Sequence, residues 1–555
     1  MNRRGFLRTI ASIKEQSTGA EASATASLNP WIPADDNPWD ASAVNHLYHR
    51  LGFGATYAEF QAAMQSSPSV IIEALMDDHL VTDGMPVPPD GWEEWLNVPP
   101  YLGPAGDVIQ HQDDLYHTAK TDIRDQWTVL MTQPEIQLRE KLTLFWHNHF
   151  VVEEVKVFHP QMMFRYLEYL RKNAWGNFKQ MVKDITITPA MLVYLSGIWS
   201  SKDELNENYG REVMELFTMG RIDQNGNENY TQDDVRHVAS AVTGWRFSFV
   251  DPSPNVLPPY FANYYFDFET KTAPFGATPK IYGLFAAKQY GTAGPDLEQI
   301  EGDIIETLFE QRASQIAWFI CTKIYRFFVY DDTTSSEANQ VIGQLAQSLL
   351  DNAWELKPVF LLLFQSEYFF DQNFRGAAIK SPYEYMCGMM RKMDIPMTDY
   401  RAGTFWWYGM DTNQWLCSPP NVKGWPGYHM WLNSSTLPKR NNDFAKTLIL
   451  NGEIPGRITN PHNGFIFDSI PLPDDEIITW AKHFPDYSGD LVQFVSQMTD
   501  HLFAFPPDDT TIAKIAASSG IIHTYEWAAL DDSLKIRPIR QMLFGLVDLP
   551  HFQLC

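Results

Sequence analysis

The sequence predicts an all-α protein, and three observations support this. Apolar residues recur at helical spacing in most segments after residue 40. No strand and helix alternation with a Gly-rich phosphate loop appears, and no repeat at solenoid spacing is present. Hydrophobic residues make up 45% and aromatic residues 14% of the 555 residues, which is enough for a sizeable core. The one expected exception is residues 247–292, where aromatic, Pro- and Gly-rich sequence predicts a loop or a small β-hairpin.

The first two helices, between residues 40 and about 80, have the clearest ends. Gly52 and Gly54 end the first of them. Thr56 and Glu59 have the spacing of a capping box and predict the start of the second. Further helices are expected over residues 123–131, after Pro134 to about 150, and over 161–173, 177–185, 204–219, 232–243, 296–308, 315–327, 335–350, 358–364, 383–393, 442–450, 475–483, 490–501 and 534–546.

Acidic residues dominate the charge of the chain. It carries 68 Asp and Glu against 42 Lys and Arg, a formal net charge of -26. A field of that sign repels phosphate backbones and anionic lipid headgroups, so no nucleic-acid partner is expected. No apolar run approaches the roughly 20 residues that cross a bilayer, so no transmembrane segment is expected either. The four cysteines lack the CxxC spacing of a zinc knuckle.

The N-terminus resembles an export signal. Residues 3–8 read Arg-Arg-Gly-Phe-Leu-Arg, which is similar to the twin-arginine signal of proteins that cross a membrane already folded. Lys14 and Glu15 cut short the apolar stretch that should follow, so the signal is degenerate or is an ordinary basic N-terminus. We expect a periplasmic or secreted protein in which residues 1–39 form the signal and a flexible tether. Residues 40–555 then form a single helical domain, with a C-terminal subdomain from about residue 440 as an alternative division.

An acidic helix is the first candidate site. At about 100° per residue, Glu207, Asn208, Arg211, Glu212 and Glu215 share one arc of roughly 140°. Glu207, Arg211, Glu212 and Glu215 are therefore candidate catalytic residues, because crowded carboxylates hold a divalent cation or raise the pKa of one Glu for acid–base work. The alternative is a solvated face in which Arg211 forms i,i+4 ion pairs with Glu207 and Glu215.

The second candidate site is a His-x-His pair. His147 and His149 are candidate metal ligands, with Glu212 as a third. The periodicity of residues 138–150 is helical, however, and places the two histidines on opposite faces. They reach one ion only if the helix ends at about Trp146. Otherwise one histidine belongs to a site and the other is a hydrogen-bonded core residue.

Two further groups are candidate ligand-binding residues. His46 and Arg50 lie one turn apart on one helical face, although the end of a helix also favours basic residues for the sake of its dipole. Lys423 and Trp425 lie in a loop rich in Pro and Gly, where they would present a cation and an aromatic platform. A plain rigid connection is the alternative for that loop. No serine elbow, Walker loop or HExxH is present.

Six segments together resemble a bacterial family known as domain of unknown function 1800. They are residues 46–54, 145–150, 206–220, 230–245, 323–329 and 421–427, so the resemblance covers nearly the whole chain. It implies an exported protein, frequently encoded beside a member of a second uncharacterised family, number 1501, which is the expected partner. It implies no known reaction. One departure stands out, because Phe266 precedes Asp267 where members of the family tend to have His.

Two functional hypotheses from different classes follow, and the sequence does not decide whether the protein is an enzyme. The first is an exported metal-dependent hydrolase or oxidoreductase, with a divalent metal ion as cofactor and Arg211 orienting an anionic group of the substrate. The second is a non-catalytic binding or assembly protein that uses aromatics such as Phe405, Trp406, Trp407 and Trp431. A third alternative is that the charged residues form internal salt bridges within a core.

Overall fold

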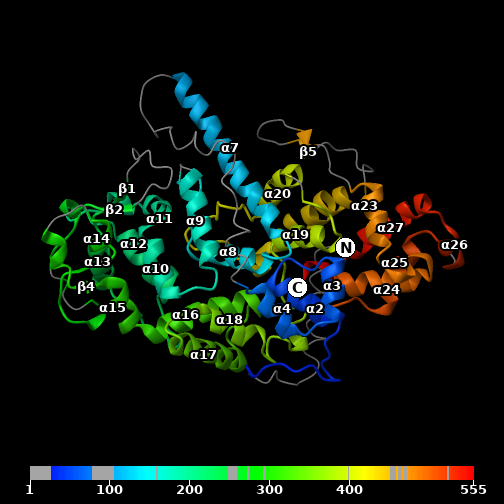
Figure 1. Cartoon of the computed structure of the whole chain (residues 1–555), viewed down its shortest axis with the longest axis horizontal. Coiled ribbons are helices and arrows are strands. Elements are labelled where there is room, and N and C mark those ends of the chain that lie inside the picture. The colour runs from blue at the N-terminus through cyan, green and yellow to red at the C-terminus, as the bar shows by residue number, and fades with distance from the viewer. Residues whose placement is uncertain are drawn as a thin grey trace.

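Helices make up most of the described chain (Figure 1), so the all-α prediction is confirmed. The computed structural model describes residues 27–77, 106–157, 160–247, 259–269, 271, 274–291, 295–397, 399–450, 458–459, 466–467, 472–521 and 524–555. Within these ranges, strands are limited to three short pairs.

The chain packs onto the body of the protein before residue 40. Trp31 is buried and stacks on Phe370, with ring centroids 4.1 Å apart. Its backbone N–H donates to the carbonyl of Gln365 at 2.7 Å. The expected flexible tether is therefore wrong at this segment, because an apolar side chain there has a buried partner surface. The twin-arginine segment, residues 3–8, lies outside the described residues.

Three short helices begin the domain: α2 (Ala41–Leu51), α3 (Tyr57–Met64) and α4 (Pro68–Leu75). Asp40 caps α2 by accepting a hydrogen bond from the backbone of Ala43 at 2.8 Å. Thr56 and Glu59 form the predicted capping box at the start of α3, which is confirmed.

The middle of the chain is helical, and one of its helices, α8 (Gln137–His149), lines the pocket described below. These helices are α7 (Gly106–Met131), α8, α9 (Pro160–Lys172), α10 (Phe178–Ile187), α11 (Pro189–Tyr194), α12 (Glu207–Glu212) and α13 (Gln232–Ala241). Helix α8 continues to His149 without a break. Helix α12 passes directly into a π-helix at Val213–Thr218, a wider turn that is frequent at functional sites.

Residues 247–292 hold short strands, as the sequence predicted. Strand β1 (Trp245–Phe247) pairs antiparallel with β2 (Pro259–Phe261). Strand β3 (Tyr282–Gly283) precedes α14 (Ala287–Tyr290) and pairs in parallel with β4 (Gly302–Asp303), which follows it. A third pair, β5 (Ile458–Thr459) and β6 (Ile466–Phe467), lies further along the chain.

The second half of the chain is again helical. Its helices are α15 (Ile304–Gln311), α16 (Ala313–Phe328), α17 (Ser336–Asp351), α18 (Leu356–Phe364), α19 (Pro382–Lys392), α20 (Asp399–Asp411), α21 (Thr436–Pro438), a π-helix at Lys439–Ala445, α22 (Lys446–Ile449), α23 (Asp474–Ala481), α24 (Leu491–Leu502), α25 (Asp509–Ser518), α26 (Thr524–Ala529) and α27 (Asp532–Val547). Arg440, near the suggested start of a C-terminal subdomain, is buried inside that π-helix. The position does not mark a linker.

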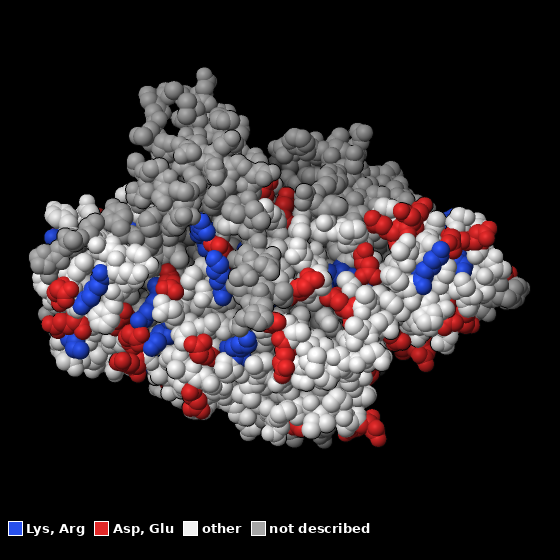
Figure 2. Space-filling view, in the orientation of Figure 1, with Lys and Arg blue, Asp and Glu red and all other residues white. Residues whose placement is uncertain are grey.

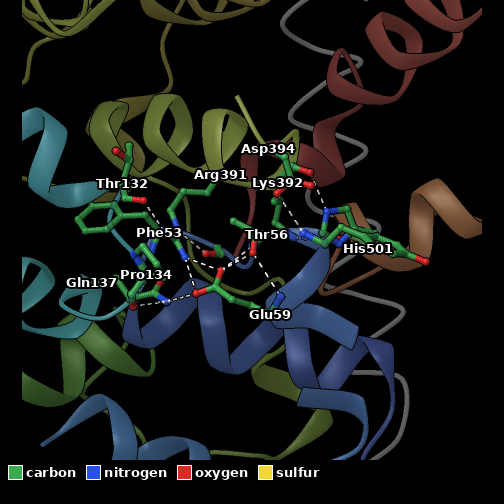
Figure 3. Close-up of polar contacts among 12 residues, drawn as sticks. Phe53, Thr56, Glu59, Thr132, Pro134, Gln137, Arg391, Lys392, Asp394 and His501 are labelled. Atoms are coloured by element: carbon green, nitrogen blue, oxygen red, sulfur yellow. Dashed lines mark hydrogen bonds and ion pairs between the residues drawn. The ribbon is translucent and has the colours of Figure 1, made fainter. Parts of the chain in front are cut away.

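A polar cluster ties the first helices to the C-terminal ones (Figure 3). Arg391 donates to both carboxylate oxygens of Glu59, at 2.9 and 2.6 Å, and to the carbonyl of Gly54 at 2.7 Å. Its neighbour Lys392 donates to Asn45 Oδ1 at 2.5 Å and to the carbonyl of His501 at 2.7 Å. Around these contacts, one continuous group of buried apolar side chains extends from the first described helices to the last.

The surface in view carries acidic side chains over both ends of the molecule (Figure 2), in keeping with the net charge of -26. Among the described residues, none of the helices is long and apolar enough to cross a membrane.

Candidate functional site

A cavity of about 300 Å³ lies where several distant parts of the chain meet. They include the end of α2, α8 from Lys141 onward, the second half of α16, the start of α19, the loop before Trp431, and Cys555. The lining residues that decide its chemistry are His49, Arg50, Lys141, Asn148, His149, Lys323, Arg326, Asp331, Glu384, Lys423 and Trp425.

Basic side chains outnumber acidic ones in this cavity. Two of the five basic residues are paired with the two acidic ones. Arg326 Nη2 lies 2.5 Å from Asp331 Oδ1, and Lys141 Nζ forms a short ion pair with Glu384. Burial would raise the pKa of Glu384, but Lys141 outweighs it and leaves that pKa below its usual value. Glu384 is therefore ionised, and each of the two carboxylates already has a basic partner.

The other three basic residues have no carboxylate within ion-pair distance among the described residues. Arg50 NH2 donates to the carbonyl of Phe374 at 2.9 Å, and its Nε is buried without a partner. Lys323 donates to neutral acceptors only. Lys423 is exposed and makes no ion pair there. Basic groups that have no carboxylate partner, Arg50 and Lys423 above all, suit a pocket for an anion.

Lys323 and His149 form a hydrogen-bonded pair on the wall of the cavity. His149 Nε2 lies 2.9 Å from the carbonyl of Phe217, which can only accept, so this nitrogen carries the proton. His149 Nδ1 is then the acceptor for Lys323 Nζ at 3.0 Å. Lys323 also donates to the carbonyl of Leu216 at 3.0 Å. Both carbonyls belong to the π-helix that follows α12, near its end.

The surroundings favour the neutral form of both side chains. Burial, followed by the nearby Arg326, lowers the pKa of Lys323 to about 7. Burial and the adjacent Lys323 hold the pKa of His149 well below its usual value. A lysine amine near neutrality beside a neutral imidazole is able to accept or donate a proton at physiological pH.

His49 also faces the cavity and is nine-tenths or more buried, yet neither of its ring nitrogens has a hydrogen-bond partner among the described residues. Burial, and then the charges of Lys380, Lys392 and Lys141, hold its pKa well below the usual value. A buried imidazole with two unsatisfied nitrogens is costly, and a bound polar ligand or water would relieve that cost.

The loop that carries Lys423 is fixed to α8 by Asn148. The backbone N–H of Trp425 donates to Asn148 Oδ1 at 2.6 Å, and the amide of Asn148 donates back to the carbonyl of Trp425 at 3.4 Å. Gly424 has a φ of +83°, and a Cβ there would lie 2.2 Å from Asn148 Oδ1. Only glycine allows this close approach. The contact between Gly424 and Asn148 therefore determines the position of the neighbouring Lys423.

The predicted ligand-binding residues divide in two. Arg50, Lys423 and Trp425 do line the cavity. His46 is not among its lining residues, and its Nε2 lies 2.9 Å from the carbonyl of Phe369, as expected of a satisfied core histidine.

The acidic helix lies outside the cavity. Glu207 pairs with Arg211 at 3.6 Å and with Arg236 at 3.4 Å, and these side chains are about a third or more exposed. Glu215 accepts a hydrogen bond from Tyr230 at 2.8 Å. The Glu207–Arg211 part of the face is thus the solvated ion pair that the alternative described.

Glu212 is the member of the acidic face whose pKa is affected by a residue of the pocket, Lys423. It is half-buried, and burial together with Glu215 raises its pKa, while Arg211 and Lys423 oppose the rise. The neighbouring carboxylate of Glu215 therefore contributes to the raised pKa of Glu212. Lys423, a basic residue of the cavity, opposes that rise.

The predicted metal ligands are not brought together. His147 packs against the rings of Trp127, Tyr166 and Trp425, its Nε2 has no hydrogen-bond partner among the described residues, and burial lowers its pKa to about 3. His149 uses both ring nitrogens in hydrogen bonds. In the part of the chain that the structure describes, no group of three or more His, Cys, Asp or Glu side chains is arranged to hold a metal ion.

The aromatic residues proposed for partner binding are mostly internal. Phe405 and Trp431 are buried, and Trp406 and Trp407 are half-buried. Burial removes Phe405 and Trp431 as an exposed binding platform, because their rings already pack against the protein.

Several lining residues were not singled out as site residues from the sequence, among them Lys141, Lys323 and His49. Lys141 shares a helical face with Leu138 and Phe145. The sequence did carry a signal, namely a lysine on an apolar helical face. Lysine is almost never fully buried unless it is paired, so this position indicates a buried interaction.

The comparison with known families decides what the chain is related to. A family model described as "Protein of unknown function (DUF1800)" matches residues 46–554. The chain belongs to this family. No curated protein and no solved structure matches it.

Four of the six segments on which the resemblance to the DUF1800 family rests contribute lining residues. They are residues 46–54, 145–150, 323–329 and 421–427. A fifth, residues 206–220, supplies the carbonyls that hold Lys323 and His149. The segments that mark this chain as a DUF1800 protein therefore meet around one pocket.

Proposed function

We propose that this DUF1800 protein binds a small molecule bearing a carboxylate or phosphate group in the cationic pocket. One observation carries the proposal. Within a chain of net charge -26, five basic side chains line one cavity, and its two acidic side chains are already paired. Charge-assisted hydrogen bonds from Lys and Arg are the usual means of holding such groups.

The dimensions fit a small ligand. A cavity of about 300 Å³ lies at the lower end of the range for small-molecule sites. Arg50 and His49 offer unsatisfied nitrogens inside it, and the exposed Lys423 stands where a ligand would enter. The ligand would thus meet a cation before it loses its hydration.

This proposal changes the chemistry expected from the sequence. The hypothesis of a metal-dependent hydrolase or oxidoreductase required His147, His149 and Glu212 to share an ion, and their placement gives it no support. Glu212 keeps a place in the proposal as an acid near Lys423, because its pKa is raised. Proton transfer in the pocket would then involve Lys323.

Export and a companion protein remain part of the proposal. If residues 3–8 direct twin-arginine export, an Arg3→Lys/Arg4→Lys variant will accumulate inside the cell, as cell fractionation will show. A partner of the family numbered 1501 would co-purify with the exported chain. Export that is unchanged in the variant would remove the first of these expectations.

Calorimetry of purified protein tests the binding proposal. The midpoint of thermal unfolding should rise with added inorganic phosphate or pyruvate, measured against sodium chloride of the same ionic strength, because ligands that bind only the folded state stabilise it. Lys423→Gln should weaken binding by roughly fivefold. Lys482→Gln is the matched control, since Lys482 pairs with Asp532 on the surface. No rise beyond that of sodium chloride would contradict the proposal.

A further inference from the structure

The amine of Lys323 has one open position. Its Nζ donates to His149 Nδ1 and to the carbonyl of Leu216, each at 3.0 Å. Nζ also lies 4.7 Å from the centroid of the Phe319 ring, and no described residue offers a third nitrogen or oxygen acceptor. A neutral amine has two N–H groups and one lone pair, so these two acceptors use both N–H groups and leave the lone pair in the third position. Lys323 lines the cavity, so a ligand bound there lies beside this amine.

The two acceptors are fixed in direction. The Nε2 proton of His149 goes to the carbonyl of Phe217 at 2.9 Å, so its Nδ1 can only accept. Leu216 belongs to the π-helix, whose end provides carbonyls without helical partners. His149 is therefore a positioning residue, which holds the amine of Lys323 in one orientation.

The charges around Lys323 favour a neutral amine over an ammonium ion. Arg326 on its own helix is the charged neighbour that adds to burial in lowering its pKa to about 7. His149 from α8 is neutral, and the π-helix offers backbone carbonyls only. Arg50, Lys141 and Lys423 line the same cavity from other elements. At pH 7 the neutral fraction of such an amine exceeds that of an exposed lysine by roughly a thousandfold.

A simpler role for Lys323 is to cap the carbonyl end of the π-helix. A cap of this kind works best as a full cation, because the end of a helix carries partial negative charge. A cap also has no need of a cavity lined by further cations. A purely capping role does not explain why an amine of fixed orientation lies beside a pocket suited to an anion.

We propose that Lys323 forms an imine with the carbonyl carbon of a small 2-oxo acid whose carboxylate is held by the basic residues of the pocket. This inference rests on the proposed anion binding and names its substrate class. The Nζ lone pair forms the new C–N bond while the carbonyl π bond breaks, and the oxygen takes up a proton. The C–O bond then breaks, and the oxygen leaves as water with the two protons lost from Nζ. No oxidant or other reactant is needed.

Reductive trapping of the full-length chain tests the inference. Pyruvate and sodium cyanoborohydride are added at about pH 7, followed by intact mass measurement and peptide mapping. We expect one trapped pyruvate per chain, located on Lys323, with labelling roughly a hundredfold or more above that of the surface residue Lys482. Labelling should rise with pH through about 7, since protonation removes the lone pair. Lys323→Arg should abolish the adduct, and Lys482→Arg should leave it intact.

Two results would overturn the inference. One is an adduct spread over surface lysines, and the other is an adduct that persists in Lys323→Arg. Mapping the unaltered chain locates the modified residue even if that variant folds poorly. Phosphate stabilisation measured on the same preparations separates the two proposals. Stabilisation without an adduct rejects the imine alone, whereas the absence of both rejects the anion pocket as well.

Discussion

Lys392 and Lys323 have the same hydrogen-bonding arrangement in two different settings. Each amine donates to two neutral acceptors, and burial lowers the pKa of each. Lys392 is fully enclosed in the cluster of Figure 3, whereas Lys323 lines a cavity. The comparison teaches that the burial of a basic residue does not by itself mark a site. What distinguishes the pocket is access, together with cations that the protein leaves unneutralised.

The largest expected loss of stability comes from a substitution that breaks the enclosed cluster of Figure 3. Glu59→Ala leaves the guanidinium of Arg391 buried without its carboxylate, and we expect a loss of about 3 kcal/mol or more in the free energy of unfolding. Chemical denaturation measures it. Anion binding should be retained, because Glu59 does not line the cavity. A loss below 1 kcal/mol would show that the cluster of Figure 3 does not hold the first helices in place.

The next largest effect comes from a substitution that distorts the pocket. Gly424→Ala meets a φ of +83° and a clash with Asn148, whereas Gly226→Ala meets a φ of +84° with open space around it. Both lose about 1 kcal/mol to backbone strain, and Gly424→Ala loses about 1–3 kcal/mol more to overpacking. Only Gly424→Ala should weaken phosphate binding, because it displaces Lys423. Equal effects of the two substitutions would mean that the close approach to Asn148 is unimportant.

A third effect uses pH to probe the enclosed cluster. Burial and Lys392 lower the pKa of His501 to about 3 from a usual 6.5. Below about pH 6.5 the unfolded chain therefore binds a proton that the folded chain does not, and stability falls as pH falls. His501→Phe should reduce this fall by about 1.4 kcal/mol per pH unit, although it lowers stability at neutral pH because the carbonyl of Lys392 keeps only its second donor, Trp480 Nε1.

Thermal unfolding at about pH 7.5 and 5.5 measures the effect, with the exposed His429→Gln as control. An unchanged pH dependence in His501→Phe would show that His501 is not held neutral.

The smallest effect concerns the acidic face. Glu207→Gln removes carboxylate contacts to Arg211 and Arg236 that are open to solvent, so stability should change by no more than about 0.5 kcal/mol. Phosphate binding should stay as it was. A large loss of either would return the acidic helix to the centre of the functional account.

Local patterns in the sequence predicted the fold class well. Helical periodicity and the capping box of Thr56 and Glu59 depend on residues within one or two turns, so the sequence displays them directly. The segment around Trp31 was misjudged because its partner, Phe370, is distant in the sequence. No local pattern identifies that partner.

The pocket was predicted only in part for the same reason. Arg50, Lys423 and Trp425 were chosen as ligand-binding residues, but nothing local shows that the end of α2 and the loop at Lys423 face one cavity. Lys323 occupies an apolar helical face between Ile320 and Phe327, a pattern that signals burial and no more. Its acceptors come from α8 and the π-helix, and only the fold brings these together.

The measurement that tests the central claim most directly is a calorimetric titration of inorganic phosphate into the purified chain and into its Lys423→Glu variant. Lys423 is exposed, so reversing its charge should leave the fold intact. We predict saturable binding by the unaltered chain that weakens by roughly tenfold or more in the variant and remains in Lys482→Glu. The same dissociation constant in all three proteins, or no binding to any of them, would contradict the assignment of this pocket to an anion.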